Sequence, residues 1–187
     1  MAISVELHDL TFRRFINQGA IEGRISTLAV ELTALLNAAP SLGSDQVPLM
    51  LGILNGAVMF HSDLIRACDF QLEVAYLRTR SYVGTSSTGK VTIDWPADLD
   101  LSGRHVVIVE DIVDSGLTLS TLTEQLRTQQ GVAGLTTVVL LDKPSARTTA
   151  FTPDLVGFSI EDAFVVGYGL DYNGLGRNLP SIYQVVD

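Results

Sequence analysis

The sequence predicts an α/β protein with a mainly parallel, twisted sheet flanked by helices. Short continuous apolar runs, typical of strands buried on both faces, alternate with longer segments of helical spacing. Polar residues follow several of these runs directly, where open sheets of this class bind their ligands. A chain of 187 residues that is 47% apolar can bury its own core, so we expect one domain over residues 1–187.

The first half of the chain supplies two predicted helices and two predicted strands. Over residues 12–36, apolar positions recur three and four apart, which predicts a helix that two glycines could divide. Residues 47–54 form a continuous apolar run and are predicted to be a buried strand. A turn at Asn55-Gly56 leads to a predicted helix over 57–68, and residues 72–83 are typical of a second strand.

The second half repeats the alternation of strand and helix. Apolar runs predict strands at 106–109, 135–141 and 164–167, and the spacing predicts a helix over about 117–130. Strands that alternate with helices favour right-handed βαβ units, which produce a parallel sheet covered on both faces.

Charge and composition exclude several classes of protein. The net charge is −9 and the pI about 4.6, which argues against a nucleic-acid binder or an anionic-membrane binder. A phosphorylated ligand must then be held by backbone amides, a few placed cations or metal ions. The single cysteine, Cys68, excludes an internal disulfide and a cysteine-ligated zinc site, and suits a reducing compartment.

The same composition leaves no obvious membrane or export segment. The longest apolar stretch, 47–60, contains Pro48, Asn55 and two glycines, so it cannot be a membrane span. The first ten residues carry acids and lack the basic region of a signal peptide. We therefore expect a cytoplasmic protein.

Residues 106–118, VVIVEDIVDSGLT, are the most informative segment. Four branched apolar residues lead into two carboxylates, Glu110 and Asp111, which suit the adjacent hydroxyls of a ribose or a divalent cation. Residues 114–118 then open a predicted helix, whose free amides and dipole attract anions. The glycine in this turn permits close approach of a phosphate, and the serine and threonine add hydroxyl donors.

A simpler interpretation is an ordinary strand end with solvated acids, in which Asp114 or Ser115 caps the helix. Three acids, a glycine and two hydroxyls within nine residues favour a ligand site instead.

The segment VVIVEDIVDSGLT resembles the phosphoribosyl-diphosphate (PRPP) motif of type I phosphoribosyltransferases. Four more segments, in the order of that family, are similar to its hypoxanthine-guanine branch. They are LNGA at 54–57, RSY at 80–82, DKPSAR at 142–147 and FVVGYGLDYN at 164–173. The resemblance implies the type I phosphoribosyltransferase fold, with a small hood subdomain made from N-terminal and C-terminal segments.

The resemblance also implies an activity. A 6-oxopurine, hypoxanthine and also guanine, would react with PRPP to give the nucleoside monophosphate and pyrophosphate, as in purine salvage. Mg²⁺ would be the cofactor, and the protein would form a homodimer or homotetramer that binds neither nucleic acid nor membrane. Two alternatives remain open: a phosphoribosyltransferase for xanthine or a pyrimidine, and a non-catalytic nucleotide-binding regulator.

Matching positions carry the implied roles on the PRPP side. Asp114 would be the catalytic base, and Glu110 and Asp111 would hold the ribose hydroxyls. The 5′-phosphate would be bound by Ser115, Gly116, Leu117 and Thr118. Pyrophosphate would be bound by Asn55, Gly56 and Arg177.

The remaining positions concern the base, the metal and closure of the site. The purine would be bound by Lys143, Phe164 and Val165. Magnesium would be held by Asp171 with Glu110 and Asp111. Ser81 and Tyr82 would begin a lid over the site.

One position departs from the family. Many members carry lysine where this chain has Asn55, so a positive charge beside pyrophosphate is missing while the backbone amides remain. The resemblance also implies a cis or strained peptide bond on one side of Asn55.

Overall fold

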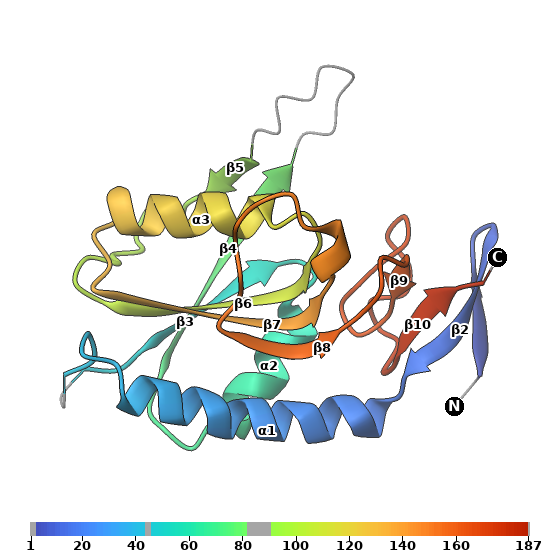
Figure 1. The fold of residues 1–187 in the computed structure, drawn as a ribbon, viewed down its shortest axis with the longest axis horizontal. Coiled ribbons are helices and arrows are strands. Elements are labelled where there is room, and N and C mark those ends of the chain that lie inside the picture. Colours follow the sequence, from blue (N-terminus) through green and yellow to red (C-terminus); the bar gives the residue numbers. More distant parts are fainter. Residues whose placement is uncertain (1–2, 44–45, 82–90, 187) are drawn as a thin grey trace.

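The computed structural model describes residues 3–43, 46–81 and 91–186, which form two sheets (Figure 1). The larger sheet has six strands in the order β5-β4-β3-β6-β7-β8, and all neighbours are parallel except β4 and β5. Its strands are β3 (Leu49–Leu54), β4 (Glu73–Ser81), β5 (Val91–Asp94), β6 (His105–Val113), β7 (Gly134–Asp142) and β8 (Leu155–Ser159). The predicted α/β class with a mainly parallel sheet is confirmed.

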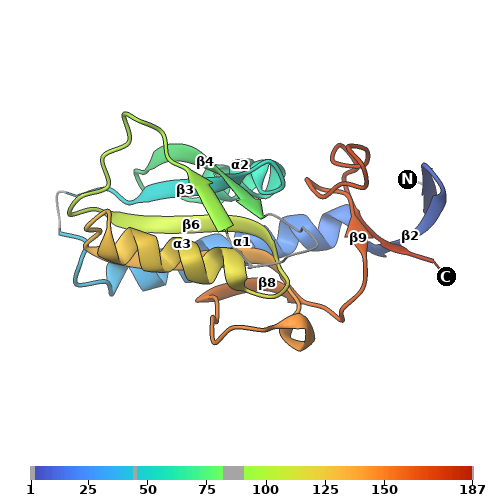
Figure 2. The same ribbon diagram turned by 90° about the horizontal axis from the view of Figure 1, so that it is seen from above.

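Helices cover both faces of this sheet. Helices α1 (Gln18–Asn37) and α2 (Val58–Ala67) lie on one face, and α3 (Leu117–Thr128) lies on the other (Figures 1 and 2). Residues of the central strand β6 alternate between the two cores. Val107 and Val109 pack with the first two helices, whereas Val106 and Ile108 pack with α3. The continuous apolar run therefore reflects burial on both faces.

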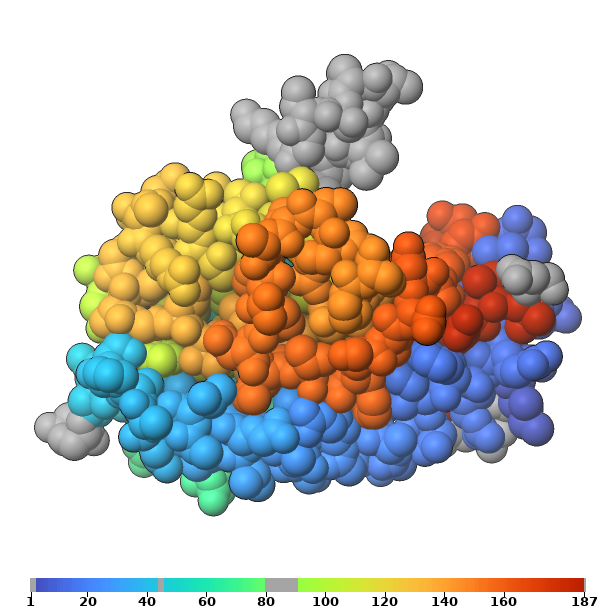
Figure 3. All heavy atoms as spheres, viewed as in Figure 1, coloured from blue at the N-terminus to red at the C-terminus, as the bar shows by residue number. Residues whose placement is uncertain are grey.

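The smaller sheet, which we call the hood sheet, joins strands from the two ends of the chain. It has the order β1-β2-β10-β9, with β1 (Ser4–Leu7), β2 (Leu10–Ile16), β9 (Val165–Val166) and β10 (Ile182–Val185). All three pairings are antiparallel. It stands beyond the carboxyl ends of the parallel strands (Figure 2). In the space-filling view, the chain after β7, in orange, lies in front of the larger sheet and runs into the hood sheet (Figure 3).

The helix predicted over 12–36 begins too early. Residues 10–16 form β2 instead, and α1 begins only after Asn17, whose side chain accepts a hydrogen bond from the Ala20 amide. The buried residues of β2 are Phe12 and Ile16, and a separation of four fits both a strand and a helix. Pairing with β1 and β10 decides between the two.

Two strand predictions also need correction. The fifth strand, predicted over 164–167, is β9 and belongs to the hood sheet, while the parallel sheet ends on β8, which was not predicted. Strand β6 continues four residues past Val109, because β7 pairs with it as far as Val113. Among the described helices, none combines the length and apolarity that a membrane crossing requires.

Two buried histidines are hydrogen bonded through both ring nitrogens. His61 on α2 contacts the Tyr76 hydroxyl and the Met50 carbonyl, each at 3.2 Å. His105 at the start of β6 contacts Ser41 Oγ at 2.7 Å and Thr136 Oγ1 at 2.9 Å. Burial is the main cause that lowers the pKa of both imidazoles, so the fold favours their neutral forms.

We expect the free energy of unfolding to decrease as the pH falls below about 6.5, the ordinary histidine pKa. There the unfolded chain binds protons that the folded chain, with its lowered pKa values, does not yet bind. Each such proton changes stability by at most about 1.4 kcal/mol per pH unit. Urea titrations between pH 5 and 7 measure the slope. The variant His105→Asn should have a shallower slope, and an equal slope would contradict the assignment.

Candidate active site

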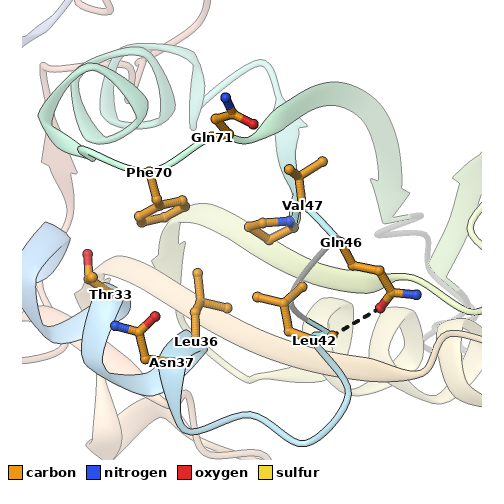
Figure 4. A pocket seen from close by; sticks show the side chains of 10 residues that line it. Thr33, Leu36, Asn37, Leu42, Gln46, Val47, Phe70 and Gln71 are labelled. Atoms are coloured by element: carbon orange, nitrogen blue, oxygen red, sulfur yellow. Dashed lines mark hydrogen bonds between the residues drawn. The ribbon is translucent and has the colours of Figure 1, made fainter.

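Four loops converge where the carboxyl ends of the parallel strands face the hood sheet. They are the loop after β3, the turn between β6 and α3, the segment after β7, and residues 167–177 between β9 and β10, which we call the hood loop. In contrast, a cavity of about 400 Å³ lies near the end of α1 and the start of β3, at the amino-terminal ends of the parallel strands (Figure 4). Its lining includes Leu36, Pro48 and Phe70 but none of the predicted site residues.

The paired carboxylates lie inside strand β6 rather than after it. Burial is the largest cause that raises the pKa of both Glu110 and Asp111, and the charge of Asp111 raises that of Glu110 further. Glu110 Oε2 is buried without a hydrogen-bond partner. A side-chain hydrogen bond with Glu110, amide hydrogen bonds and, least, the charge of Arg177 partly offset the shift of the Asp111 pKa. This pair is thus an incompletely satisfied polar site in the core of the sheet.

The loop after β3 packs directly on Asp111. The peptide bond between Leu54 and Asn55 is cis, which confirms the expectation for this loop. A Cβ atom added to Gly56 would overlap the Asp111 carboxylate, and one added to Gly169 would overlap the Gly56 carbonyl oxygen. Only glycine fits at these two positions, so the loop after β3, the hood loop and Asp111 are in direct contact.

Arg177 organises the hood loop. Its guanidinium forms an ion pair with Asp171 at 2.5 Å and donates to the Gly169 carbonyl at 2.6 Å. Asp171 also accepts from the Gly174 amide at 2.7 Å. The charge of the same guanidinium also slightly lowers the pKa of Asp111. Within the described part of the chain, no three acidic, histidine or cysteine side chains are arranged to hold a metal, so the predicted set of Asp171 with Glu110 and Asp111 is not gathered here.

The turn before α3 has the backbone geometry of an anion site. Gly116 is the N-cap, with a φ of 80°, so neither Asp114 nor Ser115 caps the helix. Ser115 Oγ accepts from the Leu117 amide at 3.3 Å, and Thr118 follows in the first helical turn. The first amides of a helix have no carbonyl partner within it and can bind a phosphate.

The segment after β7 supports this turn from behind. The Thr148 amide donates to the Ser115 carbonyl at 3.0 Å. A Cβ atom on Gly116 would come within 2.7 Å of Arg147 Cδ. The Arg147 guanidinium is itself paired with Asp142, the last residue of β7. Arg147, held by Asp142, therefore packs against the turn before α3 and limits its movement.

Lys143 brings the two halves of the predicted site together. Its ammonium group is largely buried and lies 2.8 Å from Asp114 Oδ1 and 3.4 Å from Asp162 Oδ1. The Lys143 amide donates to the Val113 carbonyl at 2.9 Å, which places the side chain beside the end of β6. A buried cation is thus shared by two half-exposed carboxylates, only one of which the sequence indicated.

The predicted base-stacking residue is exposed. Phe164 is 43% exposed although it packs edge-on against Tyr172, with ring centroids 5.6 Å apart. The next residue, Val165, lies on β9, the edge strand of the hood sheet. Because the Phe164 carbonyl accepts from the Val185 amide, antiparallel alternation directs the N–H and C=O of Val165 to the open edge. An aromatic face and a backbone donor–acceptor pair are therefore both available to a planar ligand.

Sequence reasoning missed three residues of this region. Asp162 contacts Lys143, and Tyr168 in the hood loop donates to Asp63 on α2 at 2.5 Å. The sequence offered two signals for these contacts. One is an acid shortly before an aromatic residue, and the other is a tyrosine between two glycines. Of the predicted lid, Ser81 ends β4 and Tyr82 lies outside the described residues.

Comparison with known proteins decides the family. Residues 24–173 match the family described as the phosphoribosyl transferase domain. The chain belongs to the phosphoribosyltransferases. It is 43% identical to the hypoxanthine-guanine phosphoribosyltransferase of Bacillus subtilis, over 94% of this chain and 93% of that protein. It is 40% identical to the hypoxanthine-guanine-xanthine phosphoribosyltransferase of Tritrichomonas foetus, over 91% and 89%.

The likeness extends to the fold. The crystal structure of a hypoxanthine phosphoribosyltransferase from Staphylococcus aureus superposes with a TM-score of 0.83 at 36% identity, covering 93% of this chain and 91% of that one. The type I phosphoribosyltransferase fold is thereby confirmed for this member of the family.

Gly56→Ala should weaken PRPP binding by more than tenfold, because the new methyl group displaces the Asp111 carboxylate; overpacking of this kind costs about 1–3 kcal/mol. The KM for PRPP, measured alongside thermal stability, checks this. Gly23→Ala is the matched control, since nothing lies within 4 Å of the added Cβ. It should leave the KM unchanged and stabilise α1 by about 0.5–1 kcal/mol. Equal KM values for both variants would contradict the proposed packing.

Proposed function

We propose that the protein transfers a phosphoribosyl group from PRPP to a 6-oxopurine, hypoxanthine and also guanine, and releases pyrophosphate. The observation that carries this proposal is the ion pair between buried Lys143 and Asp114. It sets a cationic hydrogen-bond donor next to a carboxylate at the mouth of an anion-binding helix terminus. The names of the relatives support the same substrates.

The PRPP end follows from the loops already described. The amides and hydroxyls of residues 115–118 bind the 5′-phosphate, and Glu110 and Asp111 accept hydrogen bonds from the ribose hydroxyls. Ribose hydroxyls would satisfy the orphaned oxygen of Glu110. Pyrophosphate binds against the loop of Asn55 and Gly56, where the amides and Arg177 supply the positive charge that an asparagine side chain lacks.

The purine is recognised by one cation, one aromatic ring and the open backbone edge of one strand. The Lys143 ammonium donates to the 6-oxo group, Phe164 stacks on the ring, and Val165 meets its edge. A 6-amino purine would place a donor against the ammonium, so two donors would face each other and the hydrogen bond from Lys143 to the base would be lost, which is a strong basis for rejection.

Asp114 is the group placed to handle the purine N7 proton. Its carboxylate contacts Lys143 and is half-exposed, so a bound base can reach it. As the bond to pyrophosphate breaks, positive charge grows on the ribose ring and negative charge on the leaving group. The fixed amides and Arg177 stabilise the latter, and Asp114 the former.

Magnesium fits this site as a cation held mainly by substrate oxygens. Mg²⁺ takes oxygen ligands and often binds through one or two carboxylates plus phosphates. Asp171 already faces a cation, the Arg177 guanidinium, and could exchange it for the metal. When bound, Mg²⁺ would neutralise charge on pyrophosphate, which the net charge of −9 otherwise repels.

A second substrate has specific support, since the relative from Tritrichomonas foetus is named for xanthine as well. A non-catalytic regulator that binds nucleic acid is disfavoured by the acidic balance of the chain. We also propose a cytoplasmic location, consistent with the single cysteine, and self-association as the family resemblance implies.

The decisive test is a panel of hypoxanthine, guanine, xanthine, adenine and uracil with PRPP, scored for pyrophosphate release with magnesium and after chelation. We expect turnover with hypoxanthine and guanine, rejection of adenine and uracil, and loss of activity on chelation. Preference for xanthine or uracil would select the alternative enzymes, and no turnover at all would favour the regulator. Full activity without metal would remove magnesium from the mechanism.

Asp114→Asn should lower kcat by about 10²–10⁴-fold, the usual contribution of a general base, because asparagine keeps the shape and loses the basic oxygen. PRPP affinity should change by less than about tenfold. Asp111→Asn is the matched comparison and should mainly weaken PRPP binding. A kcat of Asp114→Asn within about threefold of wild type would assign the carboxylate a structural role.

A further inference from the structure

Tyr168 lies in a part of the hood loop that is conformationally costly. Gly167, Tyr168 and Gly169 have φ values of 100°, 52° and 103°, so three consecutive residues are left-handed. Glycine adopts such values freely, but a tyrosine does so only where its surroundings hold it. The side chain is buried, and only 8% of the residue is exposed. A contact with the rest of the protein must therefore hold Tyr168 in this conformation.

That contact is a hydrogen bond to helix α2. The Tyr168 hydroxyl donates to Asp63 Oδ2 at 2.5 Å, a short bond to a carboxylate of the kind that is stronger than a neutral pair. Burial and the neighbouring Asp63 raise the pKa of Tyr168, so the phenol stays a donor. Asp63 lies in the second turn of α2, the helix that begins directly after the loop of Asn55 and Gly56.

The backbone next to Tyr168 contacts the groups that we assign to pyrophosphate binding. Its neighbour Gly169 packs on the Gly56 carbonyl. The Gly169 amide donates to the Arg177 carbonyl at 2.9 Å, and Arg177 Nη1 donates back to the Gly169 carbonyl at 2.6 Å. Arg177 in turn pairs with Asp171. The hydrogen bond from Tyr168 to Asp63 thus links α2, and the loop before it, to Arg177 and Asp171.

We infer that the Tyr168–Asp63 hydrogen bond is a positioning contact that sets the two pyrophosphate-binding loops at their working separation. The inference rests on the proposed function, which makes pyrophosphate part of the substrate and a product. Both residues act through Gly56, Gly169 and Arg177. The base, in contrast, meets Lys143 and β9. Gly167 separates Tyr168 from β9, and β9 is held in place by its own pairing with β10. Loss of the Tyr168–Asp63 hydrogen bond should therefore affect the pyrophosphate end selectively.

Tyr168→Phe removes only the hydroxyl and is the first variant to measure. We expect the KM values for PRPP, and for pyrophosphate in the reverse reaction, to rise about tenfold, the order expected for one charge-assisted hydrogen bond. The KM for hypoxanthine should stay within about threefold of wild type. Tyr172→Phe is the matched control, because that hydroxyl, also in the hood loop, donates to Asp9 at 2.8 Å on the exposed hood side. It should match wild type in all three KM values.

Variants of Asp63 test the other end of the hydrogen bond. Asp63→Ala should reproduce the effect of Tyr168→Phe, and the double variant should be no worse than either single one. Asp63→Asn keeps an acceptor oxygen and should restore most of the pyrophosphate affinity. Arg66→Ala removes the exposed partner of Asp63, 3.4 Å away, without touching Tyr168, and should behave as wild type.

The outcomes separate this inference from the proposed function. If wild type turns over no base, the proposed function fails. If wild type is active but Tyr168→Phe and Asp63→Ala lower only the melting temperature, or raise the KM for hypoxanthine equally, the positioning role is overturned. Should Tyr168→Phe fail to fold, the comparison of Asp63→Ala with Asp63→Asn, two changes on a helix surface, decides: equal KM values for PRPP would refute the inference.

Discussion

The contact between the Asp111 carboxylate and the Gly56 backbone is the constraint on which the site depends. It brings the central strand β6 and the loop after β3 so close that no side chain fits between them. Asp111 is buried, and the hydrogen bonds and charge that partly offset its burial come from Glu110, from amides of its own strand and, least, from Arg177 in the hood loop. The loop after β3 and the hood loop are in this sense packed around one buried acid.

The part of the site around Lys143 also holds a buried charge, but compensates it in a different way. Lys143 is buried, and two carboxylates, Asp114 and Asp162, compensate its charge without enclosing it. Both acids are half-exposed, so a ligand that offers an oxygen can share the ammonium without first displacing a packed group. Under the proposed function, an acidic protein holds an anionic substrate by placing a few of its cations, Lys143 and Arg177, at the site itself.

How much the sequence predicted depended on whether the information was local. The parallel strands and α3 follow from apolar runs and helical spacing, and the PRPP motif lies within one continuous segment, so these were predicted well. The start of α1 was not, because Phe12 and Ile16 fit both periods and pairing with β1 and with β10, which lies far along the chain, selects the strand. Asp162 and the Tyr168–Asp63 bond were missed for the same reason, since contacts between distant segments leave no periodic pattern.

The hood sheet has a consequence for how the molecule assembles. Strand β2 pairs with β10, so residue Phe12 lies opposite Val185, and almost the whole chain forms the loop between them. During synthesis from the N-terminus, the six strands of the larger sheet and the turn before α3 can all form while the β1–β2 hairpin still lacks β10. Contacts of such high sequence separation form slowly and belong late in folding. The larger sheet, with the turn before α3 and Lys143, can therefore form before the hood sheet, with Val165 and the hood loop.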